Sequence, residues 1–480
     1  MISVMAKQLT DLGMTVRIAA TTGMAATLIG GTTLHRWGGV GLAKEDVATL
    51  LRKMRRETRQ RWRDTDVLII DEVSMLDPEL FGKFDELARK IRGCHNKLFG
   101  GIQLILSGDF LQLPPVKPEG QFRFAFQHPE WEKGVHRTYV FKHVYRTTDA
   151  LFTDVLGRVR TGDQNAEDVQ ILKTRIGARI GEAEDLGILP TRLYSHRMNV
   201  DDYNKSQLDA LTDAPRASST QISVKRRSGG DGHTSQRRYV LGYTRAENQA
   251  FGQCPIGRSM EYKNGAQVML VVNLDPDEDL VNGSRGVVTD AHAEDGVEVR
   301  FLNGETRVVE PFTWKYDDAR GDKGEDITLT LKQFPLALAW AYTVHKAQGA
   351  TLDAAVMDLG ARVFGSGMSY VSLSRVRSLK SLSFIALDAG AIRADPLVKA
   401  YYAYIENNGT HKGFRATVNK IVFPTTREMC SLVKILPKLK ERREAAAAAR
   451  KRAAEEVSGN AAAGTEGEVG EPVHKKARTD

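Results

Sequence analysis

The stretch VLIIDEVSML, residues 67–76, decides the fold class. Its first four residues are apolar and have the length and composition of a strand buried in a parallel sheet. The run ends at Asp71 and Glu72, so both carboxylates are expected at the carboxyl edge of the sheet, where α/β proteins bind ligands. There one acid can hold Mg²⁺ through water, while the next deprotonates an attacking water. A strand followed by an exposed acidic turn gives the same pattern, so this motif alone leaves both interpretations open.

Two further apolar runs, VRIAA (16–20) and LILS (104–107), are of the same kind. A helix is predicted ahead of the first run, because apolar residues recur at helical spacing over residues 2–12. Helical and strand patterns alternate over residues 1–140. This alternation predicts an α/β layer architecture.

The segment LILSGDFLQLPPV (104–116) delivers Gly108, Asp109 and Gln112 to the same predicted edge. A glutamine there can hydrogen-bond the attacking water or the γ-phosphate and so sense a bound nucleotide. A strand that merely leads into a Pro-rich turn is the alternative. Two such strands separated by a helix make that alternative weaker.

Small hydroxyl residues follow the first strand in AATTGMAATLIGGTTLH (19–35). At the start of a helix, backbone amides and hydroxyl groups can donate hydrogen bonds to a phosphate. An ordinary helix N-cap has the same sequence pattern.

Two motifs with basic residues come late in the chain. AYTVHKAQGATL (341–352) places His345 and Lys346 after an apolar stretch, and GMSYVSLSRVRSL (367–379) places Arg375 after a strand-like YVSLS. An arginine that reaches a γ-phosphate stabilises the charge of the transition state. A surface salt bridge is the alternative for such an arginine.

Composition is that of a basic globular protein. The 480 residues carry a formal charge of +8, which suits a polyanionic partner, although many basic proteins bind no nucleic acid. Cys94, Cys254 and Cys430 lie far apart with no CxxC spacing, so neither a disulfide framework nor a zinc site is expected and a reducing, intracellular compartment is the default. No apolar run approaches the roughly 20 residues that cross a bilayer, and the first residues do not resemble a signal peptide.

The rest of the chain changes pattern several times. A second α/β pattern begins at about 141, and its polar stretch 214–238 is predicted to be a flexible loop. Short β-rich runs separated by Gly, Asn and Asp turns over 265–330 predict a small β-barrel-like module. Residues 438–456 are strong helix formers, whereas 457–480 contain few large apolar groups and are predicted to be disordered.

Taken in order, these segments resemble one family. The series TTG with GGTTLH, IIDEVSM, SGDFLQLPP, VYR, GAQVMLVVN with NGSRG, VHKAQG and YVSLSR is similar to the motif set of superfamily-one helicases of the Pif-one/RecD-like branch. Residues 84–110 resemble the signature sequence of that branch. The resemblance covers 1–150 and 262–382 well and 194–204 moderately, whereas 205–260 and the tail after 400 match poorly.

The resemblance implies two RecA-like domains of the P-loop NTPase type. The first, 1–140, is incomplete and holds a strand-separating wedge at about 36–63. The second, 141–400, holds an SH3-like β insert at about 262–330. A C-terminal extension at 401–437 and a basic Ala-rich helix with a disordered tail at 438–480 would follow.

The resemblance also implies residue roles around ATP and Mg²⁺. Asp71 would hold the metal, and Glu72 would be the catalytic base. Gln112 would sense the γ-phosphate, and Arg146 and Arg375 would be arginine fingers. The residues implied to contact the nucleotide are Asp71, Glu72, Gln112, Gly349 and Arg375. Those implied to grip single-stranded DNA are Thr21, Thr22, Gly23, Thr32, Thr33, His35, Phe110, His345 and Lys346.

The implied activity is ATP-driven 5′-to-3′ translocation on DNA with unwinding, in repair, recombination and telomere maintenance. The expected partners are ATP and single-stranded or forked DNA, without a membrane, and the expected state is a monomer. A nuclear location is predicted, with the mitochondrion as the alternative. HKKAR (474–478) fits a nuclear import signal or, equally, a solvating tail.

One expected motif has no counterpart in the 480 residues. A GxxxxGK[ST] loop, whose amides cradle the phosphates, should precede the first helix, and Met1 falls about where that loop should end. We predict that the chain as it stands is inactive. An incomplete form of a working helicase is favoured over a degenerate copy, because the downstream catalytic residues are all of the expected types. A non-catalytic single-strand-binding module remains the rival hypothesis, and the branch signature disfavours an RNA or protein-remodelling motor.

Overall fold

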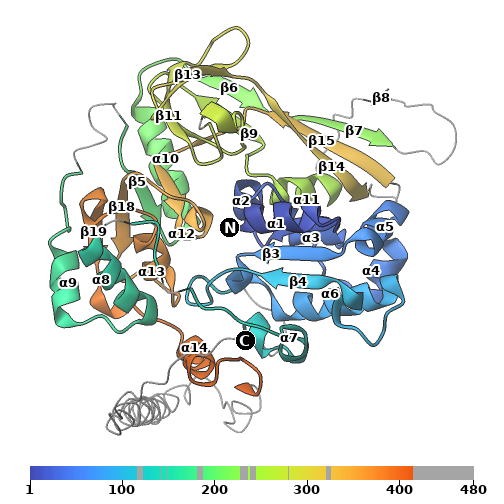
Figure 1. Cartoon of the computed structure of the whole chain (residues 1–480). Helices are drawn as coiled ribbons and strands as arrows, with labels where there is room; N and C mark the ends of the chain where they lie inside the picture. Colours follow the sequence, from blue (N-terminus) through green and yellow to red (C-terminus); the bar gives the residue numbers. More distant parts are fainter. Residues whose placement is uncertain are drawn as a thin grey trace, which may run out of the picture. The chain divides into compact units, whose positions relative to one another are not determined.

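The computed structural model describes residues 1–115, 123–141, 143–147, 149–180, 188–226, 236–237, 245–278, 280–320 and 326–414. The chain divides into two units, Met1–Val398 and Lys399–Asp480. Within the first unit, two lobes with parallel sheets and an antiparallel insert can be followed in Figure 1. The predicted α/β class is confirmed by these parallel sheets.

The first lobe, residues 1–134, is built on a parallel sheet with the strand order β2-β1-β3-β4. The strands are β1 (Val16–Ala20), β2 (Thr32–Thr33), β3 (Val67–Asp71) and β4 (Gln103–Leu106). The helices are α1 (Ile2–Asp11), α2 (Gly23–Leu28), α3 (Leu34–Gly38), α4 (Val47–Lys53), α5 (Arg56–Asp64), α6 (Pro78–Arg92) and α7 (Pro129–Gly134). Residues 67–70 of β3 are buried and only Asp71 emerges, as the apolar run predicts.

A cluster of aromatic rings anchors the charged segment 36–63 to this lobe. Trp62 of α5 is fully buried, and its ring centroid lies 4.4 Å from that of Trp37 and 5.2 Å from that of Phe84 on α6. The Trp62 Nε1–H group donates to the Gly38 carbonyl at 3.0 Å, so the buried indole is satisfied. The rings therefore hold an otherwise very polar helix in place.

Gly38 is required by this packing. A Cβ atom added there would lie 2.4 Å from the Phe84 ring. We expect Gly38→Ala to lower the free energy of unfolding by about 1–3 kcal/mol, because the ring has no room to move without disturbing both tryptophans. Urea unfolding followed by tryptophan fluorescence measures the loss. Gly157→Ala on α8 is the control, since nothing lies within 4 Å of its added Cβ; equal unfolding curves for the two variants would contradict the prediction.

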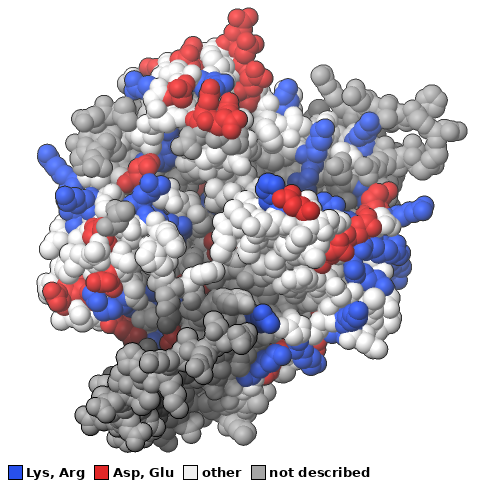
Figure 2. All heavy atoms as spheres, viewed as in Figure 1, with Lys and Arg blue, Asp and Glu red and all other residues white. Residues whose placement is uncertain are grey.

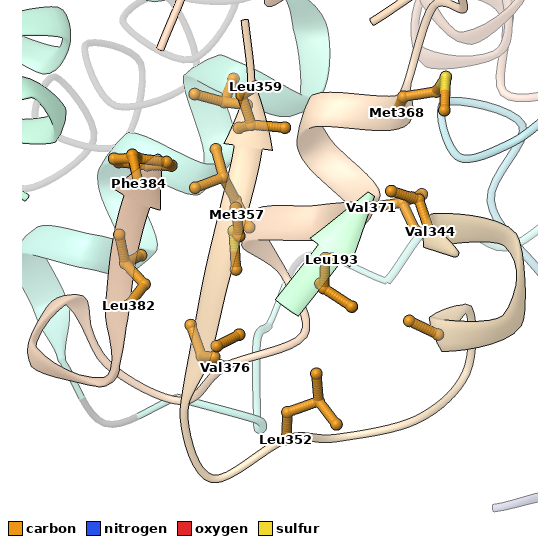
Figure 3. Close-up of a cluster of buried hydrophobic side chains, with 14 of the residues drawn as sticks. Leu193, Val344, Leu352, Met357, Leu359, Met368, Val371, Val376, Leu382 and Phe384 are labelled. Carbon is orange, nitrogen blue, oxygen red and sulfur yellow. The ribbon is translucent and has the colours of Figure 1, made fainter. Parts of the chain in front are cut away.

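The second lobe has a parallel sheet with the order β17-β5-β18-β19. The strands are β5 (Thr191–Tyr194), β17 (Ala341–Thr343), β18 (Ala355–Leu359) and β19 (Leu382–Leu387). The helices are α8 (Ala150–Thr161), α9 (Ala166–Lys173), α10 (Arg197–Ala210), α12 (Val344–Ala347) and α13 (Met368–Leu373). The helix α14 (Pro396–Asn408) begins at the end of this unit and belongs for most of its length to the unit that starts at Lys399. Figure 3 shows the core of this lobe, where side chains of β5, β18 and β19 meet those of α13.

One local prediction in this lobe is wrong. YVSLS lies in the helix α13 and its last turn, not in a strand. Residues 368, 369 and 371–373 are all buried there. Val and Leu alternate with Ser in this segment, which resembles a strand, but the buried Ser372 hydroxyl donates to the Met368 carbonyl at 2.9 Å inside the helix, a partner that the pattern does not reveal.

The insert between β5 and β17 is antiparallel. One sheet has the order β13-β12-β11-β10-β16, a second β14-β15-β7-β8, and a third pairs β6 with β9. The strands are β6 (Arg216–Ser219), β7 (Gln221–Arg226), β8 (Gln236–Arg237), β9 (Ser259–Tyr262), β10 (Gln267–Leu270), β11 (Arg285–Asp290), β12 (Val297–Phe301), β13 (Thr306–Val309), β14 (Phe312–Arg320), β15 (Asp326–Gln333) and β16 (Leu336–Leu338), with the helix α11 (Arg245–Gln253).

The predicted flexible loop at 214–238 is wrong for its described part. Residues 221–226 form β7, which pairs with β15 from Gln221↔Lys332 to Arg226↔Ile327. Ile222 and Val224 pack against the buried side chains of β15. Their alternation with polar residues is the strand signal that the surrounding basic residues obscured.

The unit that begins at Lys399 is described only as far as residue 414. The ring of Phe414 lies 5.1 Å from that of Tyr401, and the Tyr404 hydroxyl donates to the Lys412 carbonyl at 2.8 Å. Most of the predicted extension at 401–437, and all of 438–480, lie outside the described residues. Among the described helices, none has the length and apolar character needed to span a bilayer.

Candidate active site

The carboxyl ends of β1, β3 and β4 converge on one edge of the first sheet. The Thr21 amide donates to the Asp71 carbonyl at 3.3 Å, and the Thr21 hydroxyl donates to the Glu72 carbonyl at 2.9 Å. The Val73 amide donates to the Ser107 carbonyl at 3.0 Å. Three separate motifs predict residues at this edge, and the hydrogen bonds show that these residues lie next to one another.

Glu72 has a backbone conformation that directs its side chain away from the strand. Its φ is 54° and its ψ is 46°, in the left-handed region, and a residue other than glycine pays roughly 1–2 kcal/mol for it. Such strain is concentrated at functional sites, where the surrounding structure maintains it. The strain supports a functional role for this carboxylate over a plain acidic turn.

The Glu72 carboxylate meets a side chain of the second lobe. The Gln348 Nε2–H group donates to Glu72 Oε2 at 2.8 Å and lies 3.3 Å from the Ser74 hydroxyl oxygen. Burial raises the pKa of Glu72 above the usual value, while the Gln348 amide opposes that rise by stabilising the ionised form. Asp71 raises the pKa further, and Arg375 and Arg146 lower it.

Gln348 is expected to set the acid limit of catalysis. Gln348→Ala removes the donor that favours ionised Glu72, so the pKa of Glu72 rises and the base is neutralised at a higher pH. In a form that hydrolyses ATP, the acid limb of the pH–rate profile therefore moves upward, and the rate at alkaline pH changes less. The profile of Gln170→Ala, an exposed glutamine on α9, is the comparison. Superimposable acid limbs for all three proteins would rule out this role.

Asp71 supplies the carboxylate for the expected metal. No group of three or more His, Cys, Asp or Glu side chains that could hold an ion occurs within the described ranges. A single carboxylate is enough for Mg²⁺, because this ion keeps several of its waters and takes its remaining ligands from the substrate phosphates. A structural zinc site would need more protein ligands.

Gln112 presents a buried acceptor without a partner. Its Oε1 atom is inaccessible and forms no hydrogen bond with any part of the chain that the structure describes. Gly367 of the second lobe approaches this segment closely, since a Cβ added there (φ +81°) would lie 2.6 Å from the Leu111 and Gln112 carbonyl oxygens. An amide oxygen accepts a hydrogen bond from a water, which is what the predicted sensor requires.

Arg146 and Arg375 both lie close enough to Glu72 to lower its pKa. The Arg146 Nη1–H group donates to the Ser374 carbonyl at 2.9 Å. Arg375 is 2% exposed and donates to the carbonyls of Val371 at 2.7 Å and Ala350 at 3.1 Å and to the Ser374 hydroxyl at 2.7 Å. Burial, and secondly Arg146, lower the pKa of Arg375 to about 10, so it stays charged at neutral pH.

A bidentate ion pair joins the lobes beside this group. Asp109, directly after the strand β4 and its turn, receives two hydrogen bonds from Arg160 of α8, at 2.7 and 2.9 Å. The roles of Arg160 and of the Gln348 side chain are not evident from the sequence. No local pattern distinguishes Arg160 or Gln348 from ordinary polar residues, since each has its partner far away in the chain.

The residues predicted to grip DNA have mixed placements. Thr22 and Thr33 accept hydrogen bonds from the amides of Ala25 and Arg36 and so cap α2 and α3, as the ordinary N-cap interpretation holds. Gly23 begins α2, and Thr32 lies in β2. His35 is partly buried, and burial lowers its pKa. Each cap uses one backbone amide, so other amides of the same turn can still contact a phosphate.

Phe110 does not have the exposure that a DNA contact requires. Its side chain is 6% exposed and packs edge-on against Phe126 at 4.9 Å and Trp131 at 5.6 Å. The structure thus gives Phe110 a packing role in place of the predicted contact. His345 and Lys346, by contrast, lie on α12 directly after β17, with Lys346 exposed. Gly349 follows with a φ of +85°, and its added Cβ would lie 3.5 Å from Glu72 Oε1.

Comparisons with known proteins agree with this geometry. Residues 1–170 match the family model for PIF1-like helicase, and residues 251–290 match that for the 2B domain of DNA helicase Pif1. The chain is 40% identical over 388 residues to ATP-dependent DNA helicase PIF1 of Homo sapiens; the match covers 80% of this chain and 56% of that protein. The chain therefore spans little more than half the length of that relative.

Solved structures extend the comparison to the whole fold. A Pif1 helicase from Candida albicans superimposes with a TM-score of 0.69 and 31% identity, covering 84% of this chain and 92% of that one. A Bacteroides Pif1 helicase in complex with ADP-AlF3 and single-stranded DNA gives a TM-score of 0.59 and 25% identity, covering 82% and 88%. These matches agree with the acidic strand edge that faces the second lobe. The chain therefore belongs to the PIF1-like helicase family.

Proposed function

We propose that this protein is the motor of an ATP-dependent helicase that moves 5′ to 3′ along single-stranded DNA and unwinds the duplex ahead. Asp71 would hold Mg²⁺, and Glu72 takes a proton from the attacking water. Gln112 orients that water, while Arg146 and Arg375 offset the charge that develops on the transferred phosphoryl group. Mg²⁺, when bound, neutralises charge on the phosphate oxygens.

The observation that carries this proposal is the meeting of the two lobes at Glu72. The acid lies at the strand edge of the first lobe, and Gln348, Arg146 and Arg375 approach it from the second. Hydrolysis at such a junction changes the contacts between lobes, which is how a change in nucleotide state becomes a movement. The Bacteroides relative binds a nucleotide analogue and single-stranded DNA together, which supports the same pairing of ligands here.

Basic side chains offer a surface for the DNA backbone. Figure 2 shows Lys and Arg gathered over α4 and α5 of the first lobe. The residues are Arg52, Lys53, Arg56, Arg59, Arg61 and Arg63. Together with a formal charge of +8, this surface favours phosphate neutralisation, so affinity should fall steeply with salt.

DNA-stimulated ATP hydrolysis tests the proposal and separates it from its rival, a single-strand-binding module without catalysis. We propose that the 480 residues alone hydrolyse little ATP, because they contain no GxxxxGK[ST] loop. The same chain preceded by a strand and such a loop should show hydrolysis that single-stranded DNA stimulates and should displace a strand from a forked duplex with a 5′ tail. Tight DNA binding without hydrolysis in the extended form would favour the rival. Ready hydrolysis by the 480 residues alone would overturn the requirement for the loop.

The cellular setting is part of the proposal. A monomer acting in the nucleus on repair, recombination and telomeric intermediates fits the family, with the mitochondrion as the alternative. Imaging of a tagged protein at native expression distinguishes the two compartments, and light scattering with and without DNA measures the oligomeric state.

A further inference from the structure

One ion pair between the lobes lies on the turn that carries Gln112. Arg160, in the last turn of α8, donates through Nε and Nη2 to the two carboxylate oxygens of Asp109, at 2.7 and 2.9 Å. Asp109 precedes Gln112 by three residues and follows β4 at the carboxyl edge of the first sheet. The second lobe therefore holds directly the turn that presents the proposed γ-phosphate sensor.

The same aspartate organises the turn itself. Asp109 Oδ1 accepts a hydrogen bond from the Leu111 amide at 3.1 Å, and the Asp109 carbonyl accepts one from the Gln112 amide at 2.9 Å. Oδ1 thus receives one hydrogen bond from the turn and one from Arg160 of the other lobe. An aspartate that accepts from the backbone two residues further on stabilises a turn. A rotation of this carboxylate would consequently shift Leu111 and Gln112 with it.

The turn lies directly against the proposed catalytic base. Gly108 has a φ of +145°, and a Cβ atom added there would lie 2.8 Å from the Val73 amide nitrogen and 3.3 Å from the Glu72 carbonyl carbon. From the second lobe, Gly367 approaches the Gln112 carbonyl oxygen just as closely. The position of the turn therefore determines where Gln112 lies relative to Glu72.

The ion pair is also close to both proposed arginine fingers. Burial raises the pKa of the Tyr370 hydroxyl on α13, and Asp109 raises it further. Three arginines oppose that rise, namely Arg160, Arg375 and Arg146. The ion pair and the two proposed fingers thus lie within electrostatic range of one side chain of the second lobe.

The ion pair is better suited to fixing an orientation than to stabilising the fold. The Arg160 side chain is 30% exposed and that of Asp109 16% exposed. At such exposure water screens the attraction, so the contribution to stability is modest. Two parallel hydrogen bonds nevertheless set the direction of both planar groups. The orientation of the Asp109 carboxylate, and with it the turn, is therefore set from the second lobe.

We propose that Arg160 is a positioning residue for ATP hydrolysis, which holds Asp109 and through its turn places Gln112 beside the attacking water. This inference rests on the proposed function and adds to it a hold on the sensor of the first lobe that the second lobe provides. The hold exists only while the two lobes are together. Efficient hydrolysis is thereby confined to that arrangement, which couples the chemical step to the movement of the lobes.

The test compares matched exchanges on α8 in a form of the protein that carries a phosphate-binding loop. Arg160→Ala should lower the kcat of DNA-stimulated hydrolysis roughly 10- to 100-fold, because a small displacement of a positioned group is costly. Arg160→Lys keeps the charge but not the planar fork, so it should restore only part of that loss. The KM for ATP should change less than about twofold, because the oriented water matters in the transition state.

Arg158→Lys is the matched control. Arg158 lies two residues earlier on the same helix and also forms a bidentate pair, with Asp168 of its own lobe, at 2.7 Å for both hydrogen bonds. Its exchange should leave kcat unchanged, since neither partner touches the sensor turn. Urea unfolding and anisotropy with labelled DNA should show that Arg160→Ala remains folded and binds DNA, and hydrolysis is measured well below the unfolding midpoint.

A double-mutant cycle separates positioning from a general weakening of the contact between the lobes. In a Gln112→Ala background, Arg160→Ala should change kcat by less than about twofold, because the side chain that it positions is already absent. Equal losses of kcat in both backgrounds, or no loss from Arg160→Ala alone, overturn the inference and leave the proposed function standing. If the unchanged protein with the loop hydrolyses no ATP, the proposed function itself fails, and this inference with it. The two failures are therefore distinguishable.

Discussion

Replacing Glu72 by glutamine is expected to reduce DNA-stimulated ATP hydrolysis by a factor of about 10² to 10⁴, in a form of the protein that carries a phosphate-binding loop. In the proposed mechanism the Glu72 carboxylate takes the proton of the attacking water, and an amide cannot take it. Glutamine keeps the volume of the side chain and an oxygen that can accept the Gln348 hydrogen bond. Folding and DNA binding should therefore survive the substitution.

Steady-state hydrolysis at saturating ATP and DNA measures the effect of Glu72→Gln, and anisotropy with labelled DNA measures retained binding. Glu86→Gln is the control, because Glu86 is exposed on α6 and forms a surface ion pair with Lys90. The raised pKa of Glu72 adds a pH signature. The unchanged enzyme should lose activity on acidification at a higher pH than a solvent-exposed glutamate would cause. Normal turnover by Glu72→Gln would refute the assignment of the base.

Arg375→Lys should impair both hydrolysis and folding. An arginine finger contributes roughly 10³ to 10⁵ in rate, and a lysine keeps the charge but cannot reproduce the planar fork. The guanidinium also satisfies acceptors in its own lobe, at Val371, Ala350 and Ser374. A compact ammonium group reaches fewer of them, so we expect a loss of about 2–4 kcal/mol in the free energy of unfolding.

Two measurements keep the roles of Arg375 apart. Chemical unfolding reports the structural loss, and hydrolysis measured well below the unfolding midpoint reports the catalytic one. Arg377→Lys, at an exposed position two residues away, controls for the exchange of arginine for lysine in this segment. If Arg375→Lys unfolds more readily but hydrolyses ATP at the normal rate, Arg375 is a structural residue and Arg146 alone remains as the candidate finger.

The strand edge of the first lobe follows from local sequence. Residues 67–70 form a buried strand because they are apolar without interruption, and Asp71 and Glu72 emerge where that run ends. The neighbouring runs at 16–20 and 103–106 pair with it in parallel, so the carboxyl ends of all three must meet. The local pattern was enough to predict this edge, because in a parallel sheet the end of each apolar run lies on the same edge.

In three other places the sequence pattern led to a prediction that the structure does not support. YVSLS alternates Val and Leu with Ser as a strand does, but it lies in α13 and its C-cap, where the serines are buried as well. Phe110 follows a motif of the edge, yet its ring packs against Phe126 and Trp131 from a segment whose position the sequence does not reveal. Basic and polar residues around 221–226 concealed a strand whose partner is about 100 residues away.

Sequence by itself thus determined the α/β class, the acidic edge and the family resemblance, because each depends on residues close together in the chain. Only the tertiary structure decided which side chains complete the site. Gln348 reaches Glu72 across 276 positions, and Arg160 reaches Asp109 from the other lobe. Such contacts depend on how two sheets and their helices pack, and no periodicity or spacing within one segment encodes that packing.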